Sequence, residues 1–382
     1  MTAVLPSIRL DDPVNAAILA ISEDRLEGFH RDPFSEIARL SGVAVTDVRD
    51  RIRALLEAGT IRRVRQTLMA TNLAHGALAA WEVPADRLSE AFDFMCEDPF
   101  SGHVVIRSTD AGTAGSAYRL WTTLKVPEGY AIERHAAYLA AQVGATHFRL
   151  MPAKRLFALG VGHLRRRGME TGSRAPELAE VRDTEIVSLD EREWRVLTAL
   201  KREFEPGEIR EEPWGPRADE AGVPLDEFAA VARSLNERGV IGRFSTFLEH
   251  VKPTAEGERV TRYNALFHWA VPPGREIDAG REVGRHHIMT HAYWREGGPE
   301  FRGVNVMGVA HGTEKELVLA HKAAIDAHLA EAGIAVSYTN VFWGGRSEIK
   351  PSEISPIAYA AWCREHGLDP AAMRTAEPGP AA

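Results

Sequence analysis

Three side chains suited to proton transfer and anion binding alternate along one short segment of this 382-residue chain: His291, Tyr293 and Arg295. The apolar pattern predicts a strand over 290–295, and alternate residues of a strand point to the same face of a sheet. Histidine exchanges protons near neutral pH, and an arginine fork holds a carboxylate with two hydrogen bonds. The spacing therefore predicts a surface that could bind an anion and protonate it.

A second histidine, His311, ends the next predicted strand, 304–311. Antiparallel pairing of the two strands would bring His311 close to His291. Such a pair could donate protons, or one imidazole could ligate iron. We take His291, His311 and Tyr293 as candidate catalytic residues and Arg295 as a binding residue. The chain has no HExxH, GxGxxG, Walker-type loop or GxSxG pattern, so we expect no dedicated metal, nucleotide or hydrolase site.

The elements that position these residues occur twice. Gly59–Val64 is repeated as Gly239–Phe244, and Ala77–Pro84 is repeated as Ala265–Pro272. The two tryptophans of the second motif are 188 positions apart (269 − 81), and the same spacing relates His103 to His291 and Arg107 to Arg295. An internal duplication of this kind predicts two like halves packed about a pseudo-twofold axis.

Each half begins with three short predicted helices and a wing strand, followed by strands and helices in the order βαββαβ. The fold class is therefore α+β, an internally duplicated winged helix-turn-helix plus ferredoxin-like sandwich. The predicted domains are a winged helix at 12–70, a sandwich at 71–164, a linker at 165–187, a winged helix at 188–250, a sandwich with the candidate site at 251–350, and a C-terminal tail at 351–382.

The bulk composition limits the location and partners of the protein. The formal net charge is −8 with a pI near 6.0, which gives no overall attraction for a nucleic-acid backbone. The two cysteines form no pairing or metal-binding pattern, and no stretch approaches the roughly 20 apolar residues needed to span a bilayer. We expect a cytoplasmic protein with no membrane partner.

A winged helix joined to a ferredoxin-like sandwich resembles the Lrp/AsnC transcriptional regulators, so a regulator is one hypothesis. The second predicted recognition helix begins with Pro224, Asp226 and Glu227. Carboxylates at this position would face the phosphates of DNA, which basic residues normally contact. We therefore expect no nucleic-acid partner.

Three segments, in a chain with this duplication, give a more specific resemblance. The strand Tyr118–Leu124, the segment Met151–Phe157 and the strand Asn305–Gly312 resemble siroheme decarboxylase in its fused two-subunit form. The chain differs from that family in its small-residue insert Asp110–Ala117, in the single arginine of His291–Glu296, and in Val341–Arg346. These differences leave haem open as an alternative to sirohaem.

The resemblance implies an enzyme of haem biosynthesis that removes acetate carboxylates from sirohaem to give didecarboxysirohaem, with no cofactor beyond the iron tetrapyrrole ligand. A tetrapyrrole needs aromatic walls and basic groups at its rim. An alternative is a haem-binding enzyme on the same scaffold acting on haem or a small molecule, and a homodimer is possible. Besides Arg295, the candidate substrate-binding residues are Arg243, His250, Arg63, His103, Arg107 and Trp121.

Overall fold

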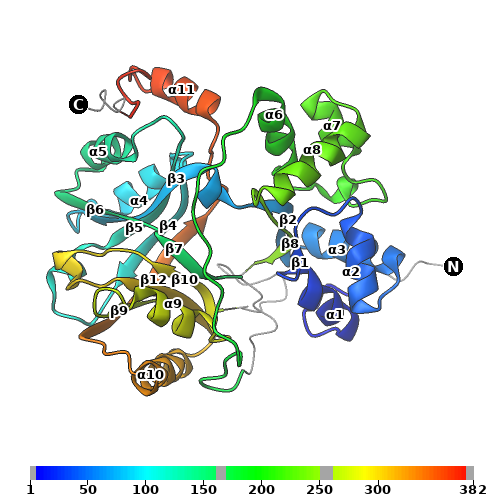
Figure 1. Ribbon diagram of the computed structural model, residues 1–382. Coiled ribbons are helices and arrows are strands. Elements are labelled where there is room, and N and C mark those ends of the chain that lie inside the picture. The colour runs from blue at the N-terminus through cyan, green and yellow to red at the C-terminus, as the bar shows by residue number, and fades with distance from the viewer. Residues whose placement is uncertain (1–5, 161–168, 250–260, 376–382) are drawn as a thin grey trace. The chain divides into compact units, whose positions relative to one another are not determined.

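The computed structural model describes residues 6–160, 169–249 and 261–375, and the chain divides into two compact units (Figure 1). Each unit collects one kind of domain from both halves of the sequence. The winged-helix unit comprises Met1–Met69, Gly160–Met169 and Val187–Arg262, and the sandwich unit comprises Ala70–Leu159, Glu170–Ile186 and Tyr263–Ala382.

The winged-helix unit holds both helix-turn-helix copies, and their wing strands pair with each other. β2 and β8 are antiparallel, with Val64 opposite Thr246, and β1 adds to the other edge of β8. The first copy contains α1 (Pro13–Ser22), β1 (Leu26–Glu27), α2 (Pro33–Ser41), α3 (Val45–Glu57) and β2 (Ile61–Leu68); the second contains α6 (Glu191–Leu200), α7 (Gly215–Ala221), α8 (Leu225–Glu237) and β8 (Ile241–Leu248).

Local sequence signals set the ends of these helices. The carboxylate of Asp32 accepts a hydrogen bond from the Ser35 amide, and Pro33 occupies the first turn of α2. Gly42 then ends α2 with a φ of 72°, a left-handed conformation that glycine adopts without strain. Asp190 and Glu193 form a capping box at the start of α6.

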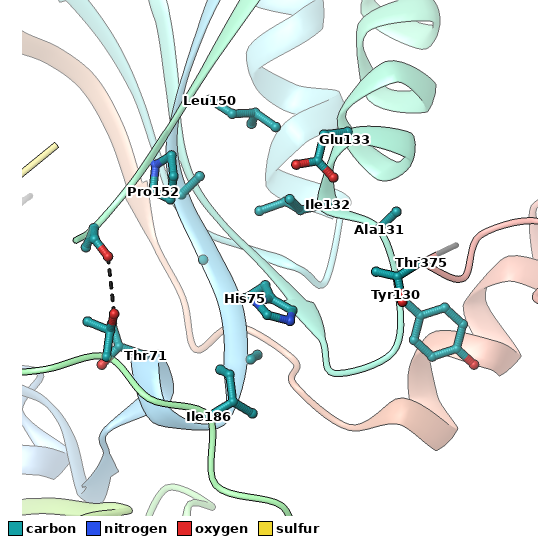
Figure 2. A pocket seen from close by; sticks show the side chains of 15 residues that line it. Thr71, His75, Tyr130, Ala131, Ile132, Glu133, Leu150, Pro152, Ile186 and Thr375 are labelled. Atoms are coloured by element: carbon teal, nitrogen blue, oxygen red, sulfur yellow. Dashed lines mark hydrogen bonds between the residues drawn. The ribbon is translucent and has the colours of Figure 1, made fainter. Parts of the chain in front are cut away.

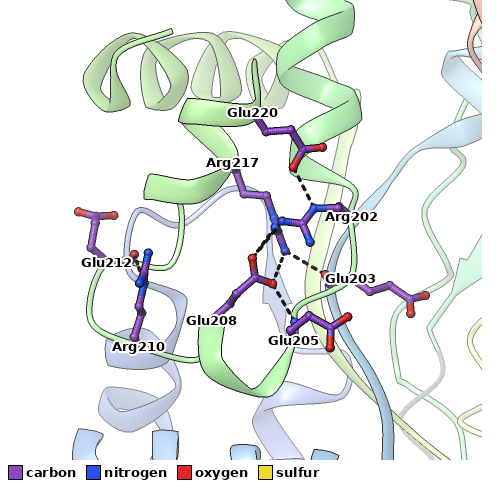
Figure 3. Close-up of polar contacts among 8 residues, drawn as sticks. All are labelled: Arg202, Glu203, Glu205, Glu208, Arg210, Glu212, Arg217 and Glu220. Atoms are coloured by element: carbon purple, nitrogen blue, oxygen red, sulfur yellow. Dashed lines mark hydrogen bonds and ion pairs between the residues drawn. The ribbon is translucent and has the colours of Figure 1, made fainter. Parts of the chain in front are cut away.

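A buried arginine ties the second copy together (Figure 3). The Arg217 guanidinium of α7 is fully buried and donates to both carboxylate oxygens of Glu208, at 2.7 and 3.0 Å. It also donates to the Glu203 carbonyl at 2.9 Å and lies over the Phe204 ring. Its charge is therefore neutralised inside the unit.

The sandwich unit contains two ferredoxin-like βαββαβ domains, which confirms the fold class. The first copy has β3 (Ala74–Glu82), α4 (Leu88–Glu97), β4 (Ser101–Ser108), β5 (Leu120–Pro127), α5 (Ile132–Val143), β6 (His147–Pro152) and β7 (Arg155–Leu159). The second has β9 (Tyr263–Ala270), α9 (Glu276–Gly284), β10 (Met289–Trp294), β11 (Val306–Gly312), α10 (Lys315–Glu331), β12 (Tyr338–Ile349) and α11 (Pro356–Glu365). Helix α11 lies within the segment predicted as a tail.

Strands of both copies join in one sheet of nine strands within the described residues, in the order β6-β3-β5-β4-β12-β9-β11-β10-β7. The last strand of each copy extends beyond its own domain. β7 of the first copy pairs with β10, and the second part of β12 pairs with β4 of the first copy. Only Ala153 and Lys154 separate β6 from β7, although these strands are the two edges of the sheet. The sheet must therefore curl until its edges lie almost end to end.

Three apolar clusters follow from this curled sheet. The helices α4, α5 and α11 cover the outer face of the first copy, and α9 and α10 cover the outer face of the second (Figure 1). The third cluster lies between the two copies and joins side chains from the inner faces of both. It includes Val105, Trp121 and Met151 of the first copy with Met307 and Phe342 of the second. The inner faces are thus partly closed by large apolar residues.

Candidate active site

The predicted column of His291, Tyr293 and Arg295 faces the inside of the curled sheet. Ala292 and Trp294, which alternate with them, pack into the cluster beneath α9 and α10. The His291 and Tyr293 rings are stacked, with centroids 6.0 Å apart and planes inclined by 13°. The Arg295 Cζ atom lies 4.4 Å from the centroid of the Tyr293 ring. The shared face expected from the alternation is therefore present.

A bulge in β10 brings His291 together with His311. Met289 is opposite Ala310 and His291 is opposite Val309, so Thr290 is an additional residue in β10. Its hydroxyl lies 3.2 Å from His291 Nδ1 and 3.4 Å from His311 Nδ1, and it donates to the Val309 carbonyl at 2.9 Å. The predicted proximity of the two histidines is confirmed, with Thr290 between them.

The hydrogen-bonding capacity of the Thr290 hydroxyl indicates the tautomer of the His291 and His311 rings. A hydroxyl carries one proton and two lone pairs. Because its proton goes to the Val309 carbonyl, the Thr290 oxygen accepts from the Nδ1–H groups of His291 and His311. Nε2 is then the acceptor nitrogen of each neutral ring.

Arg295 occupies the far end of the column and contacts the first copy. Its guanidinium donates to the backbone carbonyl of Met151 in β6, and only 8% of the residue is exposed. Burial lowers the pKa of Arg295, and the neighbouring Tyr293 partly offsets this effect. Burial likewise raises the pKa of the Tyr293 phenol. Arg295 therefore extends from the second copy toward the inner face of the first.

The arginine at the histidine end comes from the first copy. Arg107 Nη1 donates to Asn264 Oδ1 at 3.1 Å and to the Phe342 carbonyl at 3.4 Å. Asn264 is the cross-strand partner of His311. Burial lowers the pKa of Arg107 to about 10, and the residue is 4% exposed. The histidine pair of the second copy is thus combined with an arginine of the first.

An aromatic group fills the middle of the interior. Trp121 is fully buried against Phe301 and Phe342, and its indole N–H donates to the Tyr118 carbonyl at 2.7 Å. His268 lies in the same group, and neither of its ring nitrogens has a hydrogen-bond partner among the residues that the structure describes. Burial, together with the charge of Arg107, lowers the pKa of His268 to about 3. Trp121 therefore packs the interior, and His268 is neutral.

The other predicted residues do not all meet at this place. His103 faces the interior from β4 and its Nε2 lies 2.9 Å from Ser347 Oγ. Arg63 and Arg243 are on the paired strands of the winged-helix unit, where Arg63 Nε is 2.8 Å from Glu203 Oε1. His250 lies outside the described residues. The candidate residues that share the interior therefore all belong to the sandwich unit, and they are distributed over both of its ends.

Thr290, Asn264 and Lys125 were not singled out from the sequence, although all three face the interior beside the predicted residues. A bulge and a cross-strand neighbour leave no motif of their own. For Lys125 a signal was present in the duplication, because it occupies the position in β5 that His311 occupies in β11.

A cavity of about 320 Å³ lies elsewhere in the sandwich unit, between β3 and the start of α5 (Figure 2). His75, Tyr130 and Glu133 are among its lining residues. None of the predicted site residues lines it, so it is separate from the histidine pair. Across residues 6–160, 169–249 and 261–375, no three His, Cys, Asp or Glu side chains gather as metal ligands, and none of the helices described is long and apolar enough to cross a membrane.

The first of the two sandwiches matches a recognised class of ligand-binding domain. The family model described as the AsnC-like ligand binding domain matches residues 73–158, which is the sandwich of the first copy. The chain is also 25% identical to the siroheme decarboxylase of Hydrogenobacter thermophilus over 291 residues, covering 75% of this chain and 80% of that protein. The siroheme decarboxylase beta subunit of Oleidesulfovibrio alaskensis is 28% identical over 83 residues, covering 22% of this chain and 49% of the subunit.

Solved structures show the same fold. The crystal structure of the siroheme decarboxylase NirDL matches with a TM-score of 0.65 and 21% identity, over 93% of this chain and 98% of that one. A second crystal structure of NirDL, in co-complex with an iron-uroporphyrin III analogue, matches with a TM-score of 0.63 and 21% identity, over 92% and 98% of the two chains. The resemblance to siroheme decarboxylase, stated above from sequence motifs, is confirmed.

Proposed function

We propose that this protein is a decarboxylase of the siroheme decarboxylase type, which removes acetate carboxylates from sirohaem to give didecarboxysirohaem. The observation that carries the proposal is the inner sheet face, where Asn264 lies between His311 of the oriented histidine pair and a buried arginine, Arg107, that no carboxylate of the described residues neutralises. Burial is the one influence on the pKa of Arg107 within the described residues, and its side-chain partners are an amide and a carbonyl. An uncompensated buried cation favours an anionic ligand.

The chemistry requires one proton for each carboxylate that leaves. When the bond between the acetate methylene and its carboxylate breaks, carbon dioxide departs and the electron pair stays on the methylene carbon. A proton from Nε2 of His291 or His311 converts this carbon to a methyl group. The proton is then replaced from solvent, and the net reaction exchanges a carboxylate for a hydrogen. The two histidines supply the donors at this end of the sheet.

The arginine and the aromatic residues have separate roles in this proposal. Arg107 would hold a neighbouring carboxylate by charge-assisted hydrogen bonds. Tyr293, stacked on His291, supplies an aromatic face toward the interior. Arg63, Arg243 and His250 remain candidate substrate-binding residues, as does His103.

Anaerobic incubation with sirohaem, followed by mass spectrometry of the extracted pigment, tests the proposal. The product should lack two carboxyl groups. His311→Phe should reduce kcat by about 10²-fold or more, because a positioned general acid typically contributes 10²–10⁴. His147→Gln, at an exposed histidine of β6, is the matched control and should leave kcat unchanged. Unchanged sirohaem with the wild-type protein would reject the substrate, and loss of haem in its place would support the alternative enzyme.

We also infer that the winged helices do not bind DNA. The first turn of α8 carries Asp226 and Glu227. Arg192 pairs with Glu227, whereas Arg31 is shared between Asp226 and Glu212, so three carboxylates are paired with only two arginines. This leaves negative charge where a recognition helix would meet phosphates. A gel shift that weakens with added salt would contradict the inference.

A further inference from the structure

The lysine opposite Gly76 lies in a part of the interior that the proposed chemistry does not use. Lys125 is on the inner face of β5, and Gly76 is its cross-strand partner in β3. A Cβ atom added to Gly76 would lie 2.7 Å from Lys125 Nζ. The amine therefore occupies the space that a side chain at position 76 would need. Gly76 allows the lysine to lie flat against the sheet.

The duplication shows what this arrangement corresponds to. Trp81 pairs with Leu120 in the first copy, and Trp269 pairs with Val306 in the second. Counting along the strands from these pairs, Lys125 and Gly76 are the counterparts of His311 and Asn264. The pair at one end of the interior is thus histidine and asparagine, and at the other end it is lysine and glycine.

The two arginines follow the same symmetry. Arg107 donates to the Phe342 carbonyl of the second copy, and Arg295 donates to the Met151 carbonyl of the first. These carbonyls are equivalent, because Met151 is opposite Leu78 in β3 and Phe342 is opposite Leu266 in β9. Each end of the interior therefore combines a strand pair of one copy with an arginine of the other.

The charges at the two ends differ in one respect. At the histidine end, the neutral Asn264 oxygen accepts a hydrogen bond from Arg107. At the other end that amide is absent, and the amine of Lys125 takes its place near Arg295. Burial and the charge of Arg295 lower the pKa of Lys125 to about 7, and no carboxylate opposes these two influences. Arg295 thus disfavours the charged form of Lys125, and no anion among the described residues offsets this influence, which is unfavourable for the ammonium group unless a ligand supplies one.

We propose that Lys125 of the first copy and Arg295 of the second form a second anion site, which binds a carboxylate of the ligand at the end of the interior opposite the histidine pair. The proposal rests on the proposed function for the identity of the ligand, a polycarboxylate tetrapyrrole. Its geometry also suits a carboxylate of any small molecule. His291 and Arg295 are four residues apart in the chain, or about 13 Å along an extended strand, so the two anion sites are distinct.

The test follows the titration of Lys125 by NMR in full-length protein labelled with [ε-¹³C]lysine. The chain has seven lysines, so the signal of Lys125 can be assigned from Lys125→Met. Iron-uroporphyrin III is the first probe. Its carboxylate should stabilise the ammonium group and raise the pKa of Lys125 by at least one unit. Lys154, which is exposed and paired with Glu296, is the internal control and should not respond.

Affinity gives an independent readout. Lys125→Met should weaken binding of iron-uroporphyrin III by about 10-fold, and Lys125→Arg should restore most of it because the charge is retained. Lys154→Met is the matched variant and should bind as the wild type does. Binding of the pigment with no change in the Lys125 titration and no loss in Lys125→Met would overturn the second anion site while leaving the proposed function intact.

A second probe, sodium propionate, separates the two proposals. If the wild-type protein neither binds tetrapyrrole nor alters sirohaem, the proposed function fails. A rise in the pKa of Lys125 with increasing propionate would then still support the site, as one for small carboxylates. A titration of Lys125 that responds to neither probe would refute the site.

Discussion

Replacing Thr290 by valine tests the orientation of the histidine pair with little change in shape. Thr290 is fully buried, and valine keeps its branched outline while removing the hydroxyl. The hydroxyl accepts from Nδ1 of both His291 and His311, at 3.2 and 3.4 Å. If each bond contributes about 1 kcal/mol, the loss is about 2 kcal/mol. When this orientation is needed in the transition state, kcat should fall about 30-fold with little change in KM.

Two measurements check this prediction. Anaerobic turnover of sirohaem gives kcat, and ¹⁵N NMR of the imidazoles reports which ring nitrogen carries the proton. Thr290→Ser retains the hydroxyl and should behave as the wild type in both. Thermal unfolding should show that Thr290→Val remains folded. A variant with wild-type kcat and unchanged imidazole tautomers would show that the hydroxyl does not orient the rings.

Three further predictions concern stability. The pKa of His268 is about 3 in the folded protein and 6.5 in the unfolded chain, so the free energy of unfolding should fall as the pH drops from 6.5 toward 3. His268→Phe should flatten this pH dependence and raise the free energy of unfolding by about 1–3 kcal/mol, because it removes two ring nitrogens that have no hydrogen-bond partner among the described residues. An unchanged pH profile would contradict this. Gly280→Ala would place its Cβ atom 2.0 Å from the Phe157 ring and should lower the free energy of unfolding, measured by chemical denaturation, by about 1–3 kcal/mol. Gly207→Ala, where the added Cβ atom meets no other atom within 4 Å, should leave it unchanged. Arg217→Met should lower the free energy of unfolding by about 3 kcal/mol, because the Glu208 carboxylate would lose its buried partner. The same change at Arg202, which is more exposed, should lower it by less than about 1 kcal/mol. Equal melting temperatures for the two variants would refute this distinction.

Most of the fold could be predicted because its signals are local and occur twice. The apolar alternation of Ala77–Pro84, repeated at Ala265–Pro272, indicated the first strand of each sandwich, and the shared spacing indicated its partners. The face of His291, Tyr293 and Arg295 follows from the geometry of a single strand. The proximity of His311 follows from antiparallel pairing of neighbouring segments.

What could not be predicted depends on contacts between distant parts of the chain. Strand β7 pairs with β10, more than a hundred positions away, and nothing within Arg155–Leu159 specifies that partner. The pairing of β12 with β4 is equally distant in sequence, and it is this pairing that brings the Arg107 guanidinium of the first half to Asn264 and Phe342 of the second. Lys125 has no distinctive pattern within its own strand. Only the alignment of β5 with β11 relates it to His311, and that alignment requires the register of both strand pairs.

The exchange of end strands has a consequence for how such a protein can be assembled. If the two halves were made as separate polypeptides, β4 and β10 would each be left with an open edge, and unpaired edges promote aggregation. An excess of either half would therefore carry an unpaired strand edge. Joining both halves in one polypeptide enforces equal stoichiometry and keeps each open edge at high effective concentration with the strand that covers it.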